Sequence, residues 1–217
     1  LTIHRGVWGD NIRLSLAWSG WGKVSAARAA TRLLASDPGI DLLLFTGVAG
    51  AADPALRQWD VLLADAVVQH DMDARPLFPQ FTLPALKQDR LQPQQGWFDW
   101  AQTALLEAYS AGELNGFARP SSGLIATGDR FIGDPTVLQT LRDALPGLRA
   151  VEMEGAAVAQ VAEQEGVPWL VLRVISDGAD EGAAQSFEDF IKRYEQQAWR
   201  LIEALLKRCK GTPQRCE

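Results

Sequence analysis

Three apolar segments of the sequence each end in residues that suit chemistry on a small molecule. Val151-Glu-Met-Glu154 carries two carboxylates just before a helix-like stretch, and Arg173-Val-Ile-Ser-Asp177 closes an apolar run with a cation and a carboxylate. Thr46-Gly-Val-Ala-Gly50 follows a third run, and its glycines let backbone N–H groups approach a ligand closely. A charged side chain at the end of a buried strand costs free energy unless it is paired with an opposite charge or binds a ligand. Because ligands of open α/β sheets bind beyond the carboxyl ends of the strands, the three segments predict one crevice.

Each of these segments also has a purely structural interpretation. The glycines of residues 46–50 are typical of a tight strand-to-helix turn. Glu152 and Glu154 are compatible with the first turn of a helix, where the helix dipole favours acidic side chains. Arg173 and Asp177 are compatible with a structural ion pair. Taken singly, none of the three patterns identifies a function.

Histidines and cysteines are too few and too scattered for several common kinds of site. His70, beside two aspartates, is expected to be a hydrogen-bonded structural residue rather than a base, and the other histidine is His4. With these two and no G-x-S-x-G segment, a Ser-His-acid triad is disfavoured. Cys209 and Cys216 are expected to be free thiols of a reducing compartment, because a disulfide there would close only a short tail loop. The same scatter predicts that the protein has no zinc or other metal site.

Composition and missing motifs exclude further classes. The chain has 21 Lys and Arg against 27 Asp and Glu, and this net charge of −6 argues against nucleic-acid binding. Its longest uncharged stretch, residues 42–52, is far shorter than the roughly 20 residues of a membrane span. No apolar leader opens the sequence, so we expect a cytoplasmic protein. Gly20-Trp-Gly-Lys23 lacks the spacing of a P-loop, and no G-x-G-x-x-G follows a predicted strand.

Periodicity and turn residues divide the chain into alternating strands and helices. The expected strands cover residues 2–7, 12–18, 41–46, 60–68, 123–127 and 169–175, and the expected helices cover residues 24–35, 97–109, 135–145, 155–165 and 186–208.

Punctuating residues support several of these boundaries. Asp134-Pro135 is typical of an N-cap and first helical turn, and Ser186 with Asp189 resembles a capping box. The proline-rich residues 69–95 are expected to form one long functional or interfacial loop. Strands that alternate with helices predict a single three-layer α/β domain over residues 1–208, followed by a tail over residues 209–217.

Seven segments, in this order, carry a resemblance to a known family: Ser19-Gly-Trp-Gly-Lys23-Val24, Thr46-Gly-Val-Ala-Gly50, His70-Asp-Met-Asp73, Gly128-Asp-Arg-Phe-Ile132, Val151-Glu-Met-Glu154, Arg173-Val-Ile-Ser-Asp-Gly-Ala-Asp180 and Ser186-Phe187. They resemble the 5′-methylthioadenosine/S-adenosylhomocysteine nucleosidases, members of the purine nucleoside/uridine phosphorylase superfold. The resemblance covers nearly the whole chain, from about Thr2 to Leu206. It implies a central mixed β-sheet flanked by helices, and hydrolysis of the N-glycosidic bond of 5′-thio-substituted adenosines to adenine and a thioribose.

The resemblance also implies roles for the charged residues. Asp177 would protonate N7 of the departing adenine, which a carboxylic acid does well only where burial raises its pKa toward the working pH. Ser176 would orient Asp177, and Arg173 would help to place the attacking water. These three are the implied catalytic residues.

A further set of residues would bind the substrate. Glu154 would hold the 2′- and 3′-hydroxyls beside Met153, since a carboxylate accepts two hydrogen bonds at once. Phe131 would stack on adenine, the Ile132 backbone would contact its edge, and Gly50 would line the ribose. The full implied set is Trp21, Val48, Gly50, Phe131, Ile132, Glu152, Met153, Glu154 and Phe187.

The 5′ side of the substrate implies a partner subunit. Trp21 and Phe187 would border the 5′-alkylthio group together with residues 77–81, and in this family that loop comes from the neighbouring subunit. The resemblance therefore implies a homodimer that uses no cofactor and binds neither nucleic acid nor membrane.

Two departures from the family pattern keep other functions open. Family members begin with a strand and a glutamate that activates water, and we expect this upstream segment to be omitted from the sequence, which opens at Leu1. Val48 replaces the family's small hydroxyl residue, and a lost hydrogen bond typically costs about 1 kcal/mol. The alternatives are another nucleosidase or phosphorylase, such as a futalosine hydrolase or a purine nucleoside phosphorylase, and a nucleoside-binding protein that has lost catalysis.

Overall fold

The computed structural model describes residues 1–9, 11–179 and 183–209, with the side chains of residues 183–186 outside the description. Four features of the sequence analysis therefore lie outside the described residues: Asp180, the Ser186 side chain, Cys216 and most of the tail. The strands are β1 (Ile3–Trp8), β2 (Ile12–Ala17), β3 (Leu43–Ala51), β4 (Val61–Gln69), β5 (Ser121–Thr127), β6 (Leu148–Glu152) and β7 (Trp169–Asp177). The helices are α1 (Lys23–Ser36), α2 (Gln95–Ser110), α3 (Pro135–Ala144), α4 (Gly155–Gln164), α5 (Ala183–Tyr194) and α6 (Trp199–Leu206).

Five strands form one mixed sheet that closes on itself in the order β3-β6-β5-β4-β7. β3 is parallel to β7 and antiparallel to β6, while β4 is parallel to β5 and antiparallel to β7. The expected α/β class with a mixed sheet is therefore confirmed. The closure, which periodicity along the chain does not predict, brings the ends of distant strands together. β1 and β2 pair separately with each other, in antiparallel orientation.

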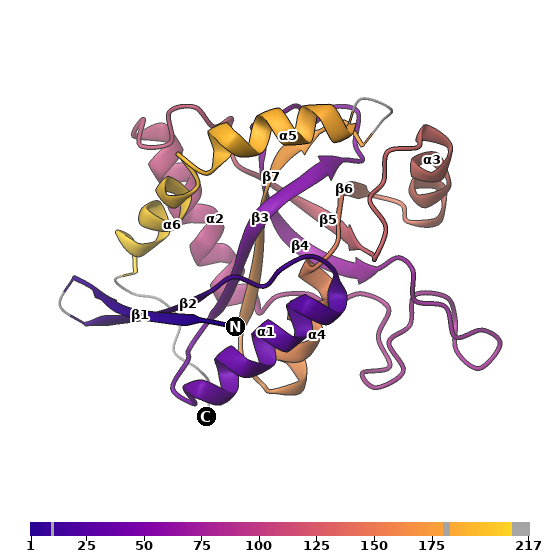
Figure 1. The fold of residues 1–217 in the computed structure, drawn as a ribbon, viewed down its shortest axis with the longest axis horizontal. Coiled ribbons are helices and arrows are strands. Elements are labelled where there is room, and N and C mark those ends of the chain that lie inside the picture. Colours follow the sequence, from indigo (N-terminus) through magenta and orange to yellow (C-terminus); the bar gives the residue numbers. More distant parts are fainter. Residues whose placement is uncertain (10, 180–182, 210–217) are drawn as a thin grey trace.

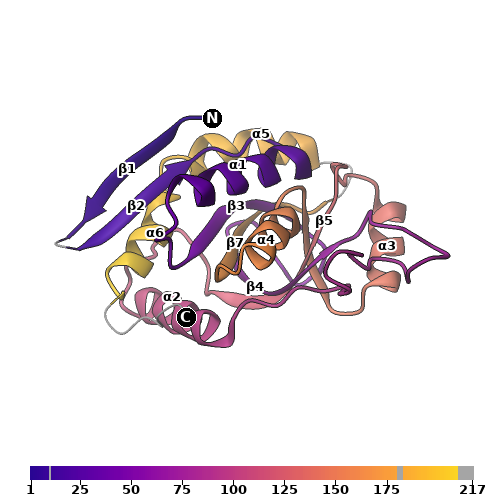
Figure 2. The ribbon, with the colours of Figure 1, turned by 90° about the horizontal axis from the view of Figure 1, so that it is seen from below.

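Helices cover the closed sheet on two sides (Figures 1 and 2). On one side α1 and α4 pack together, and their buried alanines, Ala26 and Ala159 among them, favour helix and let the two helices approach closely. On the other side α2, α5 and α6 bury a second apolar cluster that includes Leu105, Leu172 and Phe190. Among the described residues, no helix is long and apolar enough to span a bilayer.

Most predicted elements are found within one or two residues of their expected bounds, and two predictions were wrong. Residues 46–51 are not a turn after a strand, because β3 continues through both glycines to Ala51. The last helix is not continuous, since the chain breaks its helical course between Tyr194 and Trp199. It also begins at Ala183, so the expected capping box falls inside α5. The loop over residues 70–94 contains only isolated bridges, as predicted.

Candidate active site

The closed sheet places Gly50 between two of the predicted segments. Gly50 lies opposite Asp177 of β7 on one side and opposite Val151 of β6 on the other. A Cβ atom at Gly50 would stand 2.9 Å from Asp177 Oδ1 and 3.0 Å from Ala179 Cβ. A side chain therefore does not fit there without moving Asp177, and glycine at this position allows the Asp177 carboxyl to lie close to the backbone of β3.

Asp177 ends β7 with a buried carboxyl whose two oxygens have different partners. The Ala179 N–H donates to Oδ1 at 2.9 Å, and Ser176 Oγ lies 2.6 Å from Oδ2. Ser176 Oγ also lies 3.2 Å from the Ala49 carbonyl oxygen. A hydroxyl has one proton, so Ser176 can donate to only one of these two acceptors at a time. Ser176 thus connects the Asp177 carboxyl to the backbone of β3.

A cavity of about 510 Å³ adjoins Asp177 and Gly178. Residues of the 51–58 segment line its other walls, with Leu138 and Arg142 of α3. The Asp177 carboxyl is thus buried in protein and still next to an open volume, but among the described residues Asp177 is the one predicted site residue that lines this cavity.

Arg173 does not pair with Asp177, which corrects one of the structural interpretations of the sequence. It forms a buried ion pair with Glu152 instead, through Nη2 and through Nε at 3.1 Å. The other groups around Glu152 are the Thr127 hydroxyl and the N–H groups of Glu154 and Gly155, all of which donate to its carboxylate. Glu152 is therefore fully occupied within the protein, and it lies at the end of β6 rather than in the first turn of a helix.

Glu154 has a different environment, although it stands only two residues further along. Its side chain accepts a hydrogen bond from the Gly22 N–H, which lies 2.7 Å from Oε1 just before α1. Gly22 has a φ of 85°, which favours glycine. Burial raises the pKa of Glu154, and the neighbouring Glu152 carboxylate raises it further. Glu154 therefore combines a position beside the site with capacity to accept further hydrogen bonds.

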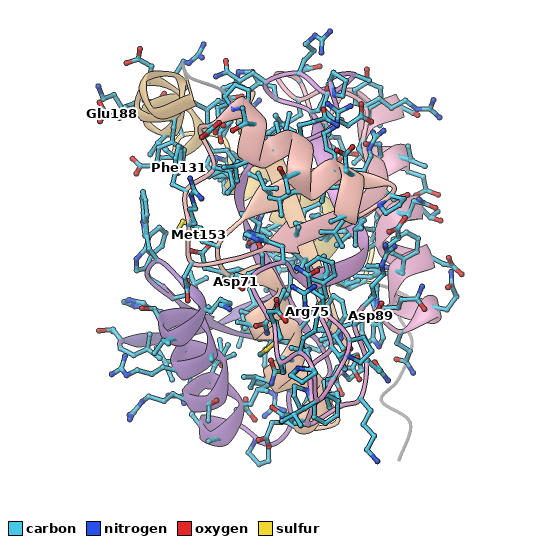
Figure 3. All side chains as sticks on the ribbon, turned by 90° about the vertical axis from the view of Figure 1, so that its right-hand side faces the viewer. Asp71, Arg75, Asp89, Phe131, Met153 and Glu188 are labelled. Atoms are coloured by element: carbon cyan, nitrogen blue, oxygen red, sulfur yellow. The ribbon has the colours of Figure 1, made fainter. Side chains whose placement is uncertain are left out.

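Aromatic side chains of three segments meet around Phe187 of α5. Its ring lies 5.7 Å from that of Trp21 and 6.1 Å from that of Phe131, both in edge-to-face geometry. Trp21 and Phe131 remain 61% and 41% exposed, which leaves apolar surface for a ligand. In Figure 3, Phe131 and half-buried Met153 lie between α5 above and α1 below.

Two predicted residues face the protein rather than open space. The Val48 side chain packs against the apolar cluster under α2 and α5, and Ile132 is buried under α3. At Val48 and Ile132, a ligand can therefore contact main-chain groups rather than the side chains. The expectation that His70 is hydrogen-bonded is not met at its ring: Nε2 is buried without a partner among the described residues. The ring lies where a Cβ at Gly128 would be, at 2.3 Å.

Sequence reasoning missed four residues that hold the site together: Thr127, Lys23, Asp71 and Asp129. Lys23, Asp71 and Asp129 stand in the motifs that carry the resemblance, and this was the available signal. Among the described residues, no group of three or more His, Cys, Asp or Glu side chains is arranged to hold a metal ion.

Comparisons with known proteins find relatives of this chain. A family model described as the phosphorylase superfamily matches residues 1–207. A 5′-methylthioadenosine/S-adenosylhomocysteine nucleosidase of Geobacillus thermodenitrificans is 38% identical over 200 residues, covering 91% of this chain and 80% of that protein. The sequence resemblance is thereby confirmed.

Solved structures agree in fold. A 5′-methylthioadenosine/S-adenosylhomocysteine nucleosidase of Colwellia psychrerythraea in complex with adenine has a TM-score of 0.87 with this chain. The two are 29% identical, and the match covers 98% of this chain and 84% of that one. A futalosine hydrolase of Helicobacter pylori has a TM-score of 0.83 and 31% identity, over 94% of this chain and 83% of that one.

Proposed function

Because the chain belongs to the 5′-methylthioadenosine/S-adenosylhomocysteine nucleosidase family of the phosphorylase superfamily, we propose that it hydrolyses the N-glycosidic bond of 5′-thio-substituted adenosines. The products are adenine and a thioribose. The observation that carries the proposal is the buried Asp177 carboxyl, held by Ser176 and the Ala179 N–H beside a cavity.

Asp177 acts as the general acid. As the bond to C1′ breaks, the adenine leaves with the bonding electrons and takes a proton at N7, while the ribosyl group becomes an oxocarbenium-like cation that water captures. Ser176 Oγ lies within hydrogen-bond distance of both Asp177 Oδ2 and the Ala49 carbonyl oxygen, and so holds the carboxyl in place at the end of β7. Ser176 is the positioning residue for this proton.

Glu154 holds the ribose hydroxyls. Gly22 occupies one of its oxygens, so the other oxygen and the remaining lone pairs can accept from the 2′- and 3′-hydroxyls. Met153 packs on the sugar, and Gly50 leaves room at its edge. Phe131 stacks on adenine, the Ile132 and Val48 backbones line the cleft, and the exposed Trp21 with Phe187 borders the 5′ group.

Arg173 and Glu152 work as a pair. Arg173 helps to place the water, while Glu152 fixes the guanidinium and anchors the N-terminus of α4 next to Glu154. This pairing also bears on the phosphorylase alternative. A phosphate dianion needs cationic charge, and the charge of Arg173 is balanced by Glu152, which favours water over phosphate as the nucleophile.

Futalosine hydrolysis is the second candidate, supported by the structural likeness to the Helicobacter pylori enzyme. Parallel incubation with 5′-methylthioadenosine, S-adenosylhomocysteine and futalosine, with and without phosphate, separates the candidates. We expect free base from the thio-substituted adenosines without phosphate, and a strict phosphate requirement would contradict hydrolysis.

The Asp177→Asn variant tests the acid directly. An amide has no acidic proton to donate, so adenine release should fall by about 10²–10⁴-fold, in the range of general acid–base contributions. Circular dichroism and thermal unfolding should show an intact fold. The matched control is Asp65→Asn, because Asp65 lies on β4 and has no role in the mechanism. Near-normal turnover by Asp177→Asn would remove Asp177 from this role.

The protein also forms a homodimer under this proposal. Leu77 is 84% exposed on the 70–94 loop, and Val24 is 80% exposed on α1. The family resemblance assigns residues 77–81 to a contact with the neighbouring subunit, and these exposed apolar side chains are available to such a contact. Light scattering measures the mass in solution, and a single-chain mass at assay concentrations would contradict the dimer.

A further inference from the structure

A ring of hydrogen bonds joins three segments that lie far apart in the sequence. Lys23 Nζ donates to Asp71 Oδ1 at 2.6 Å, and the Asp129 N–H donates to Asp71 Oδ2 at 2.9 Å. The Lys23 N–H in turn donates to Asp129 Oδ1 at 2.7 Å, which closes the ring. Asp71 therefore accepts from both partners through its carboxylate, while Asp129 accepts through its carboxylate and donates through its backbone N–H.

The ring stands beside the two elements proposed to hold the substrate. Asp129 lies in the segment that carries Phe131 and Ile132, next to the adenine. Lys23 opens α1 directly after Gly22, whose N–H donates to Glu154. The consecutive N–H groups of Gly22 and Lys23 thus hold one carboxylate from the ribose side and one from the base side.

The ring is tied to the fold rather than lying loose on the surface. Lys23 Nζ also lies 3.3 Å from Gln69 Oε1, and Gln69 Nε2 donates to Gln160 of α4 at 2.7 Å. The side chain of Lys23 is 19% exposed and that of Asp71 is 32% exposed. Burial works against the charge on Asp71, but the bonds from Lys23 and Asp129 outweigh it and hold its pKa below the usual value.

We propose that Asp71 is a positioning residue that sets the distance between the adenine segment, residues 128–132, and the start of α1, which orients Glu154. Asp71 has one oxygen for each side, so a single carboxylate couples the base subsite to the ribose subsite. The inference rests on the proposed function and adds a residue to it that touches no substrate atom.

The isosteric Asp71→Asn variant breaks this coupling. Asparagine has one acceptor oxygen, so either Lys23 Nζ or the Asp129 N–H would face an NH2 group in place of an acceptor. We expect adenine to bind at least about 10-fold more weakly, which corresponds to 1.4 kcal/mol. We also expect KM for 5′-methylthioadenosine to rise by more than kcat falls. Adenine lacks the ribose, so calorimetry with adenine alone reports on the base segment.

Asp73→Asn is the matched control. Asp73 also receives several hydrogen bonds, but they come from the neighbouring Arg75, which lowers the pKa of Asp73 to about 2. In Figure 3, Arg75 lies farther from α1 than Asp71 does. Adenine binding and turnover of this variant should stay within twofold of the unmodified protein. Lys23→Met is a second test, which removes the ammonium group and should weaken adenine binding in the same direction.

The outcomes separate the two proposals. If the unmodified protein releases adenine from 5′-methylthioadenosine but Asp71→Asn and Lys23→Met bind adenine as Asp73→Asn does, the positioning role is overturned and the function stands. A lower unfolding temperature with unchanged adenine affinity also overturns it, because that is the result of a merely structural ion pair. If the unmodified protein neither binds adenine nor releases it, both proposals fall.

Discussion

Glu152 and Glu154 are the same residue type, two positions apart, and the fold treats them in opposite ways. Glu152 has a side chain that is 2% exposed, and its two oxygens accept from Arg173, Thr127 and two backbone N–H groups. Glu154 lies half-buried at the N-cap of α4 and turns away from that helix to Gly22. One carboxylate is committed to the protein, and the other keeps acceptor capacity for a ligand.

The difference shows how a strand end can combine rigidity with reactivity. Glu152 is held by a buried ion pair with Arg173 and by several hydrogen bonds, and it fixes the backbone from which Glu154 projects. Glu154 has too few partners to offset its burial, and its raised pKa records that imbalance. A buried ionisable side chain with few hydrogen-bond partners and a perturbed pKa is typical of functional sites.

Removing the charge of Glu152 should have the largest effect on stability. Glu152→Gln leaves the buried Arg173 guanidinium uncompensated, and breaking a buried pair costs about 3–5 kcal/mol. For a chain of this length that corresponds to a fall of roughly 10 °C in the unfolding temperature. Calorimetry or thermal circular dichroism measures this shift.

Glu203→Gln is the control for that prediction. Glu203 pairs with Lys207 on the surface of α6 at 3.3 Å, and its loss should cost no more than about 0.5 kcal/mol. Equal shifts in the two variants would mean that the buried pair adds nothing special to stability.

Glu154→Gln should show the reverse pattern. We expect kcat/KM for 5′-methylthioadenosine to fall on the order of 100-fold, since hydrogen bonds to charged groups contribute about 1.5–3 kcal/mol. The unfolding temperature should hold or rise, because the change removes a charge that burial disfavours. Adenine release and thermal unfolding, measured on the same samples, test both halves. An unchanged rate of adenine release in Glu154→Gln would mean that Glu154 is only a charged residue at the end of a helix.

Local patterns in the sequence predicted most elements but not the pairings between them. The Asp134 cap is an example of a local signal that holds, since its side chain accepts from the Thr136 N–H at 2.8 Å. The structural interpretation placed Gly47 and Gly50 in a turn, but the need for glycine at both positions comes from side chains on the neighbouring strand. A Cβ at Gly47 would approach Arg173 Nη1 to 3.1 Å, as one at Gly50 would approach Asp177.

The same limit applies to the site. Arg173 was considered with Asp177, four residues away on the same strand, but sheet closure gives it Glu152 instead. The bond between Gly22 and Glu154 spans 132 positions. Position along the chain carries no information about such a contact without the topology. The motifs indicated which residues matter, and the fold decides which carboxylate is occupied and which remains available.

The pH dependence of binding gives the smallest and most specific test of the contrast between the two glutamates. The pKa of Glu154 is raised above its ordinary value of 4.5, so protonation begins at a higher pH than for an exposed glutamate. As the pH falls through this raised pKa, Glu154 loses acceptor capacity and kcat/KM should decline. Stability should change in the opposite sense, because the native state binds this proton more tightly than the unfolded chain does. Relative to Glu154→Gln, the unmodified protein should therefore gain stability as its activity falls. In Glu154→Gln the acidic decline of kcat/KM should disappear or move to lower pH, and an identical decline in both proteins would assign it to another group.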